Sequence, residues 1–216
     1  MSRRQRGSRA LRDQGVSAFS GILMRLCAAS GALATALVDR DGETVDYAGS
    51  LSPYEIKVAA AELQIVIALV RRSRGLEVKA TEHVIARAAR RTFSLIALTD
   101  GYALVLVLSR RSFVVSRRGV AEAIRELERE AGLTYASGTR RKYERWARVE
   151  VRTARGDPRR PEAIWLEGEW QPLALLGRFR SRDLERREVG YRARLGTGAE
   201  FALVREPPGR WFVEDL

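Results

Sequence analysis

The chain has 216 residues, 45% of them apolar, and a formal net charge of +12. This size and composition exclude a disordered chain and predict two folded domains, because single domains most often have about 100–150 residues. The single cysteine, Cys27, excludes a disulfide framework and a cysteine-based zinc cluster, so we expect a reducing compartment, the cytoplasm. We expect neither an export signal nor a membrane span, because no apolar segment is long enough for either.

The positive charge is concentrated in an arm, residues 1–15, and in a connector, residues 138–160, whereas residues 161–216 are close to neutral. Arginine-rich segments of this kind can neutralise nucleic-acid phosphates or an anionic surface. A proteome rich in arginine and alanine, as a GC-rich bacterial genome encodes, explains the same bias equally well. The composition alone therefore leaves both explanations open.

The first helix is predicted for residues 16–29 and a buried strand for residues 32–38. One face of this helix is apolar at helical spacing, through Phe19, Ile22, Leu23, Leu26 and Cys27. The segment Asp39-Arg40-Asp41-Gly42 then predicts a tight hairpin, because aspartate side chains cap their own backbone and glycine accepts a positive φ. A second strand is predicted for residues 43–47.

Four acids at this hairpin raise the question of a metal site or an acid–base pair: Asp39, Asp41, Glu43 and Asp46. Side chains alternate along a strand, so Glu43 and Asp46 are expected on opposite faces. The residues after Gly42 do not follow the ligand spacing of an EF-hand calcium loop. We therefore interpret the segment as a turn and expect no metal site there.

The second helix is predicted to begin at Pro53, because Ser52 and Glu55 have the spacing of a capping box, and to end before Gly75. Its core face is predicted from six apolar residues: Ile56, Ala59, Leu63, Val66, Ile67 and Val70. A second apolar flank contains Val58, Ile65 and Leu69. A solvated stripe contains Tyr54, Lys57, Ala61, Gln64, Ala68 and Arg71. A helix with this much apolar surface is expected to pack on its own sheet and also on a partner.

Three more strands and a third helix are predicted after the second helix. The strands lie within residues 77–89, 91–99 and 102–108, with a hairpin at Asp100-Gly101 between the last two. The last strand is nearly all apolar, as a central strand should be. The third helix, which ends at Gly132, is predicted from Val120, Ile124, Leu127 and Ala131. The resulting order is α-β-β-α-β-β-β-α.

This order, with a DxDG hairpin after the first strand and a DG hairpin before an apolar last strand, resembles the roadblock/LC7 family over residues 16–133. That family includes bacterial gliding-protein partners of Ras-like GTPases. The resemblance implies an α+β sandwich, in which a five-stranded antiparallel sheet carries the second helix on one face and the first and third on the other. It also implies a homodimer that pairs edge strands, here near residues 82–88, and sets the second helices side by side through Val58, Ile65 and Leu69.

Residues 134–160 are predicted to be a basic linker whose middle, residues 147–153, can form a strand. Residues 161–216 are predicted to form a small antiparallel β-barrel, because turn signals recur about every ten residues. Six aromatic residues are available for its core: Trp165, Trp170, Phe179, Tyr191, Phe201 and Trp211. They can instead stack nucleobases, but the near-neutral charge of residues 161–216 favours a core role.

Few residues offer catalytic chemistry. His83 is the only histidine and lies on a predicted strand, and Cys27 lies on an apolar helix face. No phosphate-binding loop of the P-loop type is present. Arginines at the end of the second helix, Arg71, Arg72 and Arg74, can act on the phosphates of a GTPase, but capping of the helix C-terminus explains them more simply. We expect no enzymatic activity, no cofactor and no metal.

Two functions are compatible with these features. The first is a non-enzymatic homodimeric adaptor that binds a small Ras-like GTPase, as an activator or as a scaffold, in bacterial polarity, motility or trafficking. Its GTPase surface is expected on the solvated stripe of the second helix: Tyr54, Lys57, Ala61, Gln64, Ala68 and Arg71. The alternative is a nucleic-acid-binding protein that contacts phosphates through the arm, the linker and the barrel, with the first domain as the dimeriser.

Overall fold

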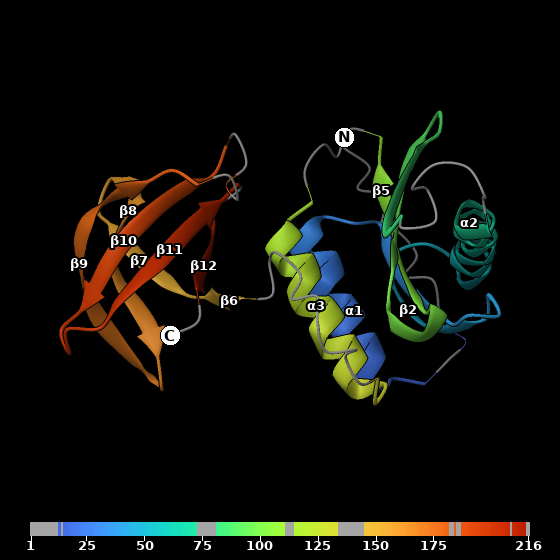
Figure 1. Cartoon of the computed structure of the whole chain (residues 1–216), viewed down its shortest axis with the longest axis horizontal. Coiled ribbons are helices and arrows are strands. Elements are labelled where there is room, and N and C mark those ends of the chain that lie inside the picture. Colours follow the sequence, from blue (N-terminus) through green and yellow to red (C-terminus); the bar gives the residue numbers. More distant parts are fainter. Residues whose placement is uncertain are drawn as a thin grey trace, which may run out of the picture. The chain divides into compact units, whose positions relative to one another are not determined.

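A computed structural model describes residue 13 and residues 15–72, 81–110, 115–133, 145–181, 184, 187–207 and 209–214 (Figure 1). The chain divides into two compact units. The first contains Met1–Val115 and Ala123–Ser137, and the second contains Ser116–Glu122 and Gly138–Leu216. Residues 1–12 of the predicted arm and residues 134–144 of the predicted linker lie outside the described residues, as does Arg74.

The described part of the first unit has the predicted order of elements. They are α1 (Ala18–Ser30), β1 (Ala34–Val38), β2 (Thr44–Gly49), α2 (Pro53–Arg72), β3 (His83–Arg87), β4 (Arg91–Ala97), β5 (Ala103–Ser109) and α3 (Arg117–Glu130), which joins this unit at Ala123. Neighbouring strands pair antiparallel in the order β2-β1-β5-β4-β3. The five-stranded antiparallel sheet is therefore confirmed, and β3 is an edge strand, as predicted.

Helices cover both faces of this sheet, with α2 on one face and α1 and α3 on the other (Figure 1). The central strand β5 is buried on both faces, which explains why its sequence is almost entirely apolar. Val105 and Val107 join the core cluster that packs against α2. Leu104 and Leu106 alternate with them and are also fully buried. The arrangement of helices that the roadblock/LC7 resemblance implies is thus present.

The acidic segment forms the predicted hairpin between β1 and β2. Asp39 Oδ1 accepts hydrogen bonds from the backbone N–H groups of Asp41 and Glu43, each at 2.9 Å. The carboxylate of Asp39 therefore stabilises the turn, as the sequence predicts. Asp46 is buried in β2, away from this turn, and accepts hydrogen bonds from the Ser17 hydroxyl and from the backbone N–H of Tyr47. Among the described residues, no three His, Cys, Asp or Glu side chains lie close enough to hold a metal ion.

The described part of the second unit contains a curled antiparallel sheet (Figure 1). Its strands are β6 (Trp146–Val149), β7 (Val151–Ala154), β8 (Asp157–Leu166), β9 (Glu169–Phe179), β10 (Val189–Leu195), β11 (Glu200–Glu206) and β12 (Arg210–Glu214), in the order β6-β12-β11-β10-β9-β8-β7. Hairpins join β8 to β9 at Glu167-Gly168 and β10 to β11 at residues 196–199, as predicted. No helix in the described ranges is long and apolar enough to cross a membrane.

The strand expected within residues 147–153 is present as parts of β6 and β7, whereas residues 157–160, which were expected in the linker, begin β8. Apolar and charged residues alternate there, so one side of each strand can pack while the other stays in water. Val149 and Val151 pack against the core of the second unit, and the neighbouring Arg148 and Arg152 are exposed. The positive charge of this segment is therefore carried on the surface of the second unit.

The core of the second unit uses only part of the predicted aromatic set. Tyr191, Phe201 and Trp211 are buried in it. Trp165 and Trp170 are 41% and 38% exposed, so the prediction that they fill the core is wrong. Trp165 follows the fully buried Ile164, and alternation along the strand places the two side chains on opposite faces.

A buried ion cluster also belongs to the second unit. Arg118, in the segment Ser116–Glu122 of this unit, is fully buried. Its Nη1 lies 3.0 Å from Glu188 Oε2 and 2.8 Å from Glu206 Oε1. The guanidinium carbon lies 4.7 Å from the centroid of the Trp146 ring. Because two buried carboxylates contact this one guanidinium, the stability of this part of the unit depends on Arg118.

Candidate functional site

Helix α2 begins at the predicted capping box. The backbone N–H of Glu55 donates to the Ser52 hydroxyl at 3.3 Å, and Glu55 Oε2 accepts hydrogen bonds from the backbone N–H and the hydroxyl of Ser52. Arg91 of β4 adds a hydrogen bond to Glu55 Oε1 at 3.0 Å. The hydrogen bonds from Ser52 and from Arg91 lower the pKa of Glu55 from its ordinary value. These contacts fix the start of the helix and tie it to the sheet.

The side of α2 that points away from the sheet is apolar. Ile65 and Leu69 are each 61% exposed, Val66 is 41% exposed and Val58 is 37% exposed. We call these four residues the outer face of α2. Apolar side chains this exposed on one helix are typical of an interaction site, because isolated soluble surfaces seldom concentrate them. The predicted second flank, Val58, Ile65 and Leu69, is thus open in the single chain.

The core face of α2 differs from the prediction at Val66, Gln64 and Ala60. Val66 was expected in the core and is exposed, whereas Gln64 was expected in solvent and is only 7% exposed. Gln64 Nε2 donates to the backbone carbonyl of Gly101 at 2.9 Å, which satisfies the amide N–H in its buried position. The fully buried Ala60 lies on the same side as Gln64 and lets the helix approach the sheet closely. Compared with the prediction, the helix is therefore rotated about its axis so that Ala60 and Gln64 face the sheet and Val66 faces outwards.

The predicted GTPase surface is only partly exposed. Tyr54 is 77% exposed in the first turn of α2, and Arg71 is exposed in its last turn. Three of the four residues between them on the predicted stripe are half-buried: Lys57, Ala61 and Ala68. Gln64 faces the sheet, so its assignment to a partner surface is wrong. The exposed part of the predicted stripe therefore consists of Tyr54 and Arg71, at opposite ends of the helix.

Asp13 is a contact of α2 that the sequence interpretation missed, because it assigned this residue to the arm. Asp13 Oδ2 lies 2.7 Å from Lys57 Nζ, and Asp13 Oδ1 accepts a hydrogen bond of 2.7 Å from the Tyr47 hydroxyl. Lys57 also lies over the Tyr47 ring. The hydrogen bonds from Lys57 and then from Tyr47 hold the pKa of Asp13 below its ordinary value. No regular spacing in the sequence connects these three residues.

Replacing Lys57 by alanine should raise the pKa of Asp13 towards its ordinary value, because the largest cause of the lowering is removed. A carboxyl with a lowered folded pKa stabilises the fold above its unfolded pKa, and this contribution disappears as the pH falls through the folded pKa. The carboxyl-carbon NMR titration of Asp13 measures the change, with Lys57→Arg as the control that keeps the ion pair. Identical titration of Asp13 in Lys57→Ala and in the unmodified protein would contradict this assignment.

The other two candidate residues, His83 and Cys27, each lie next to a hydroxyl group of a neighbouring strand. His83 on β3 has its Nε2 2.8 Å from the Ser94 hydroxyl. Cys27 is buried, and its Sγ lies 3.4 Å from the Thr35 hydroxyl. Burial raises the pKa of the Cys27 thiol, which opposes formation of the reactive thiolate.

Comparison with known proteins gives matches only among solved structures, since no family model and no curated protein matches the chain. MglB from Myxococcus xanthus is similar with a TM-score of 0.48 and 16% identity, over 56% of this chain and 100% of that chain. A roadblock/LC7 domain from Streptomyces avermitilis has a TM-score of 0.43 and 15% identity, over 53% and 98%. The gliding protein mglB from Thermus thermophilus has a TM-score of 0.43 and 17% identity, over 59% and 98%. This chain thus covers nearly the whole of each structure, and each structure covers little more than half of this chain.

Proposed function

We propose that this protein is a non-enzymatic homodimeric adaptor that binds a small Ras-like GTPase in the bacterial cytoplasm, in polarity, motility or trafficking. The observation that carries the proposal is the outer face of α2, where Val58, Ile65, Val66 and Leu69 are exposed together. A second copy of the chain can cover this face with the same residues, as a two-fold interface requires. The GTPase partner comes from the roadblock/LC7 resemblance, whose element order and sheet the first unit has.

The layering of the first unit supports the dimer. Five strands about 4.8 Å apart make a sheet about 20 Å wide, whereas a helix with its side chains is about 10–12 Å across. Among the described residues, α2 is the only helix on its face of the sheet, while α1 and α3 share the other face. The uncovered part of this sheet face therefore leaves room for the α2 of a second copy, which can pack against the outer face of the first. The edge strand β3 ends the strand order and can pair with its counterpart.

The exposed ends of α2 are the proposed contact with the GTPase. Tyr54 is a large, rigid side chain at one end, and Arg71 is a cation at the other. Tyrosine and arginine are residues that often dominate the energy of protein interfaces. In a dimer with paired α2 helices, each of these side chains occurs twice on one surface. We place the GTPase on that surface.

Titration calorimetry tests the partner. Each small Ras-like GTPase encoded in the source genome, loaded with GDP or with a non-hydrolysable GTP analogue, is titrated into the full chain. We expect one of them to bind, and Tyr54→Ala or Arg71→Ala to weaken binding at least about fivefold without changing the mass of the dimer. Phosphate release from the same GTPase then distinguishes an activator from a scaffold.

Arg40→Ala is the matched control for Arg71→Ala, because Arg40 is also an exposed arginine of the first unit but lies in the β1–β2 hairpin. Its loss should leave GTPase binding unchanged. If none of the GTPases binds in either nucleotide state, the adaptor function is contradicted. If Arg40→Ala weakens binding as much as Arg71→Ala, the proposed surface on α2 is wrong.

We also infer that the curled sheet of the second unit closes into the predicted small barrel. β6 pairs with β12 at one end of the strand order, and β7 pairs with β8 at the other. These two terminal strands follow each other in the sequence, separated only by Glu150. The backbone N–H of Trp165 donates to the Glu150 carbonyl at 3.0 Å, at this junction. A single bent segment therefore supplies both edges of the sheet and supports closure.

A further inference from the structure

Two tryptophans form an exposed pair on the second unit. Trp165 of β8 and Trp170 of β9 are direct partners in the strand register, so their side chains lie on the same face of the sheet. Their ring centroids are 5.4 Å apart, at an interplanar angle of 67°. The guanidinium carbon of Arg152 lies 5.5 Å from the centroid of the Trp170 ring. We call Arg152, Trp165 and Trp170 the tryptophan platform.

The platform remains open although burial of these rings would be favourable. Fully burying a tryptophan removes a large apolar area from water, and small domains need that area for stability. The second unit nevertheless keeps both rings partly exposed, at 41% and 38%, and builds its core from Tyr191, Phe201 and Trp211. A pair of large, rigid rings left accessible in this way indicates a ligand that contacts them.

Arginines extend from the platform across the same face. Ala174 of β9 lies four residues after Trp170, so both point to one side of the sheet, and Ala174 is the register partner of Arg194 on β10. Arg192 points to the same side two residues earlier, and both arginines are exposed. Arg194 is held by an ion pair with Glu200. Trp170 thus lies between arginines of β7 and β10.

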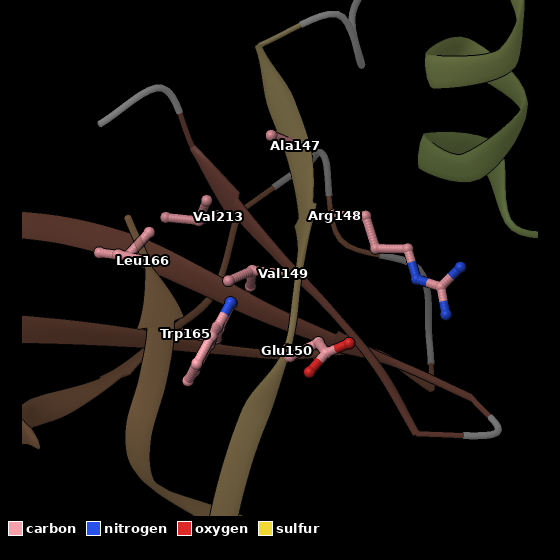
Figure 2. A pocket seen from close by; sticks show the side chains of 7 residues that line it. All are labelled: Ala147, Arg148, Val149, Glu150, Trp165, Leu166 and Val213. Atoms are coloured by element: carbon pink, nitrogen blue, oxygen red, sulfur yellow. The ribbon is translucent and has the colours of Figure 1, made fainter. Parts of the chain in front are cut away.

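A cavity of about 660 Å³ opens next to the platform (Figure 2). Seven residues line it: Ala147, Arg148, Val149, Glu150, Trp165, Leu166 and Val213. Figure 2 shows the Trp165 ring beside Val149, with the guanidinium of Arg148 pointing to the other side of β6. The cavity therefore has mostly apolar walls, and its volume is in the range of small-ligand sites. A flat aromatic group that inserts there makes contact with Trp165.

We propose that the tryptophan platform binds single-stranded nucleic acid, with bases stacked on Trp165 and Trp170 and phosphates held by Arg152 and the arginines of β10. Every base has a π-face, so such stacking does not require a particular sequence. Arginine matches phosphate with two hydrogen bonds and also stacks on rings, so it suits both tasks. A duplex does not fit, because its bases are stacked on each other and do not present their faces.

Charge complementarity favours nucleic acid over a protein segment. Among the described residues 145–214, arginines outnumber Asp and Glu, because the strands β6, β7 and β8 bring the basic residues 145–160 into the unit. The near-neutral charge of residues 161–216 is therefore not the charge of the folded unit. Both rings are also exposed, so the near-neutral charge of residues 161–216 no longer supports a core role for Trp165 and Trp170.

Fluorescence anisotropy with a labelled oligothymidylate of about 12 nucleotides tests the platform in the full chain. We expect binding at low salt that weakens steeply as salt is added, because phosphate contacts release counterions. Trp165→Ala and Trp170→Ala should each weaken binding at least about fivefold, and Trp170→Phe should keep most of it, since phenylalanine retains a stacking face. All four tryptophans of the chain belong to the second unit, so intrinsic fluorescence reports whether a variant keeps that unit folded.

Arginine variants separate the platform from general charge. Arg152→Ala should weaken binding several-fold, whereas Arg40→Ala in the first unit removes the same charge and should have little effect. Residues 1–12 and 134–144 also contain arginines, so equal affinity in Trp170→Ala and the unmodified chain would assign binding to those segments and overturn the proposal. The absence of binding at low salt would also overturn it and would leave a protein segment as the ligand.

The adaptor function is tested separately, because Leu69→Asp changes the dimer and leaves the platform intact.

Discussion

Leu69→Asp should convert the protein from dimers into monomers. Leu69 is 61% exposed in the single chain and lies at the proposed contact between two α2 helices. An aspartate there places one charge from each copy in an apolar interface, where neither has a cationic partner among the outer-face residues. The cost of removing such charges from water is expected to exceed about 3 kcal/mol, which weakens association at least about a hundredfold. Light scattering on the variant should give the mass of one chain, 24.2 kDa.

Met24→Asp is the matched control for this variant. Met24 is 50% exposed on α1, on the opposite face of the sheet from α2. The same change from an apolar side chain to a carboxylate should leave the dimer unchanged there. Circular dichroism should show native helix content in both variants, because each residue is already exposed to solvent. A dimer that persists in Leu69→Asp excludes the outer face of α2 as the contact.

Arg118→Ala should lower the free energy of unfolding of the second unit by about 3–5 kcal/mol. The variant leaves Glu188 and Glu206 buried without the guanidinium that contacts both of them. It also removes one of two guanidinium groups that lie over the Trp146 ring, the other being that of Arg145. Chemical denaturation followed by tryptophan fluorescence measures the effect, because all four tryptophans are in this unit.

Two further variants show whether the buried charges cause this loss of stability. Arg192→Ala removes an exposed arginine of the same unit and should change the free energy of unfolding by less than about 0.5 kcal/mol. A triple variant, Arg118→Met with Glu188→Leu and Glu206→Leu, replaces the charges by apolar groups and should recover most of the stability. If Arg118→Ala is as stable as Arg192→Ala, the guanidinium is not what compensates the buried carboxylates.

The element order of the first unit was predictable because local signals mark its boundaries. The capping box at Ser52 and Glu55, the turn at Asp39 and the apolar run of β5 each act within a few residues of the chain. Such signals do not depend on how the elements pack. The sheet and the sides on which the helices lie then followed from the family that this order resembles.

The orientation of α2 about its axis was less predictable, because it depends on packing. A ranking by hydrophobicity places Val66 inside and Gln64 outside. In the structure, a close approach of the helix at Ala60 and a hydrogen bond from Gln64 to the Gly101 carbonyl favour the opposite arrangement. Neither contribution is visible in the periodicity of apolar residues. The predicted partner stripe consequently included one residue that faces the sheet.

In the second unit, composition was misleading in two ways. Residues 154–160 are rich in arginine and were assigned to a linker, although residues 157–160 begin β8 and a strand can carry charge on one face and pack its other face. Trp165 and Trp170 were assigned to the core because residues 161–216 are close to neutral, although their strand positions face outwards. Alternation with Ile164 is the signal in the sequence that could have identified the exposed side of Trp165.

Light scattering on the unmodified full chain over a range of concentrations tests the central claim most directly. The exposed apolar face of α2 predicts a mass of twice 24.2 kDa at concentrations where the dimer is populated. A mass of 24.2 kDa at every concentration up to the solubility limit would contradict it, because Val58, Ile65 and Leu69 would then remain uncovered by a second copy.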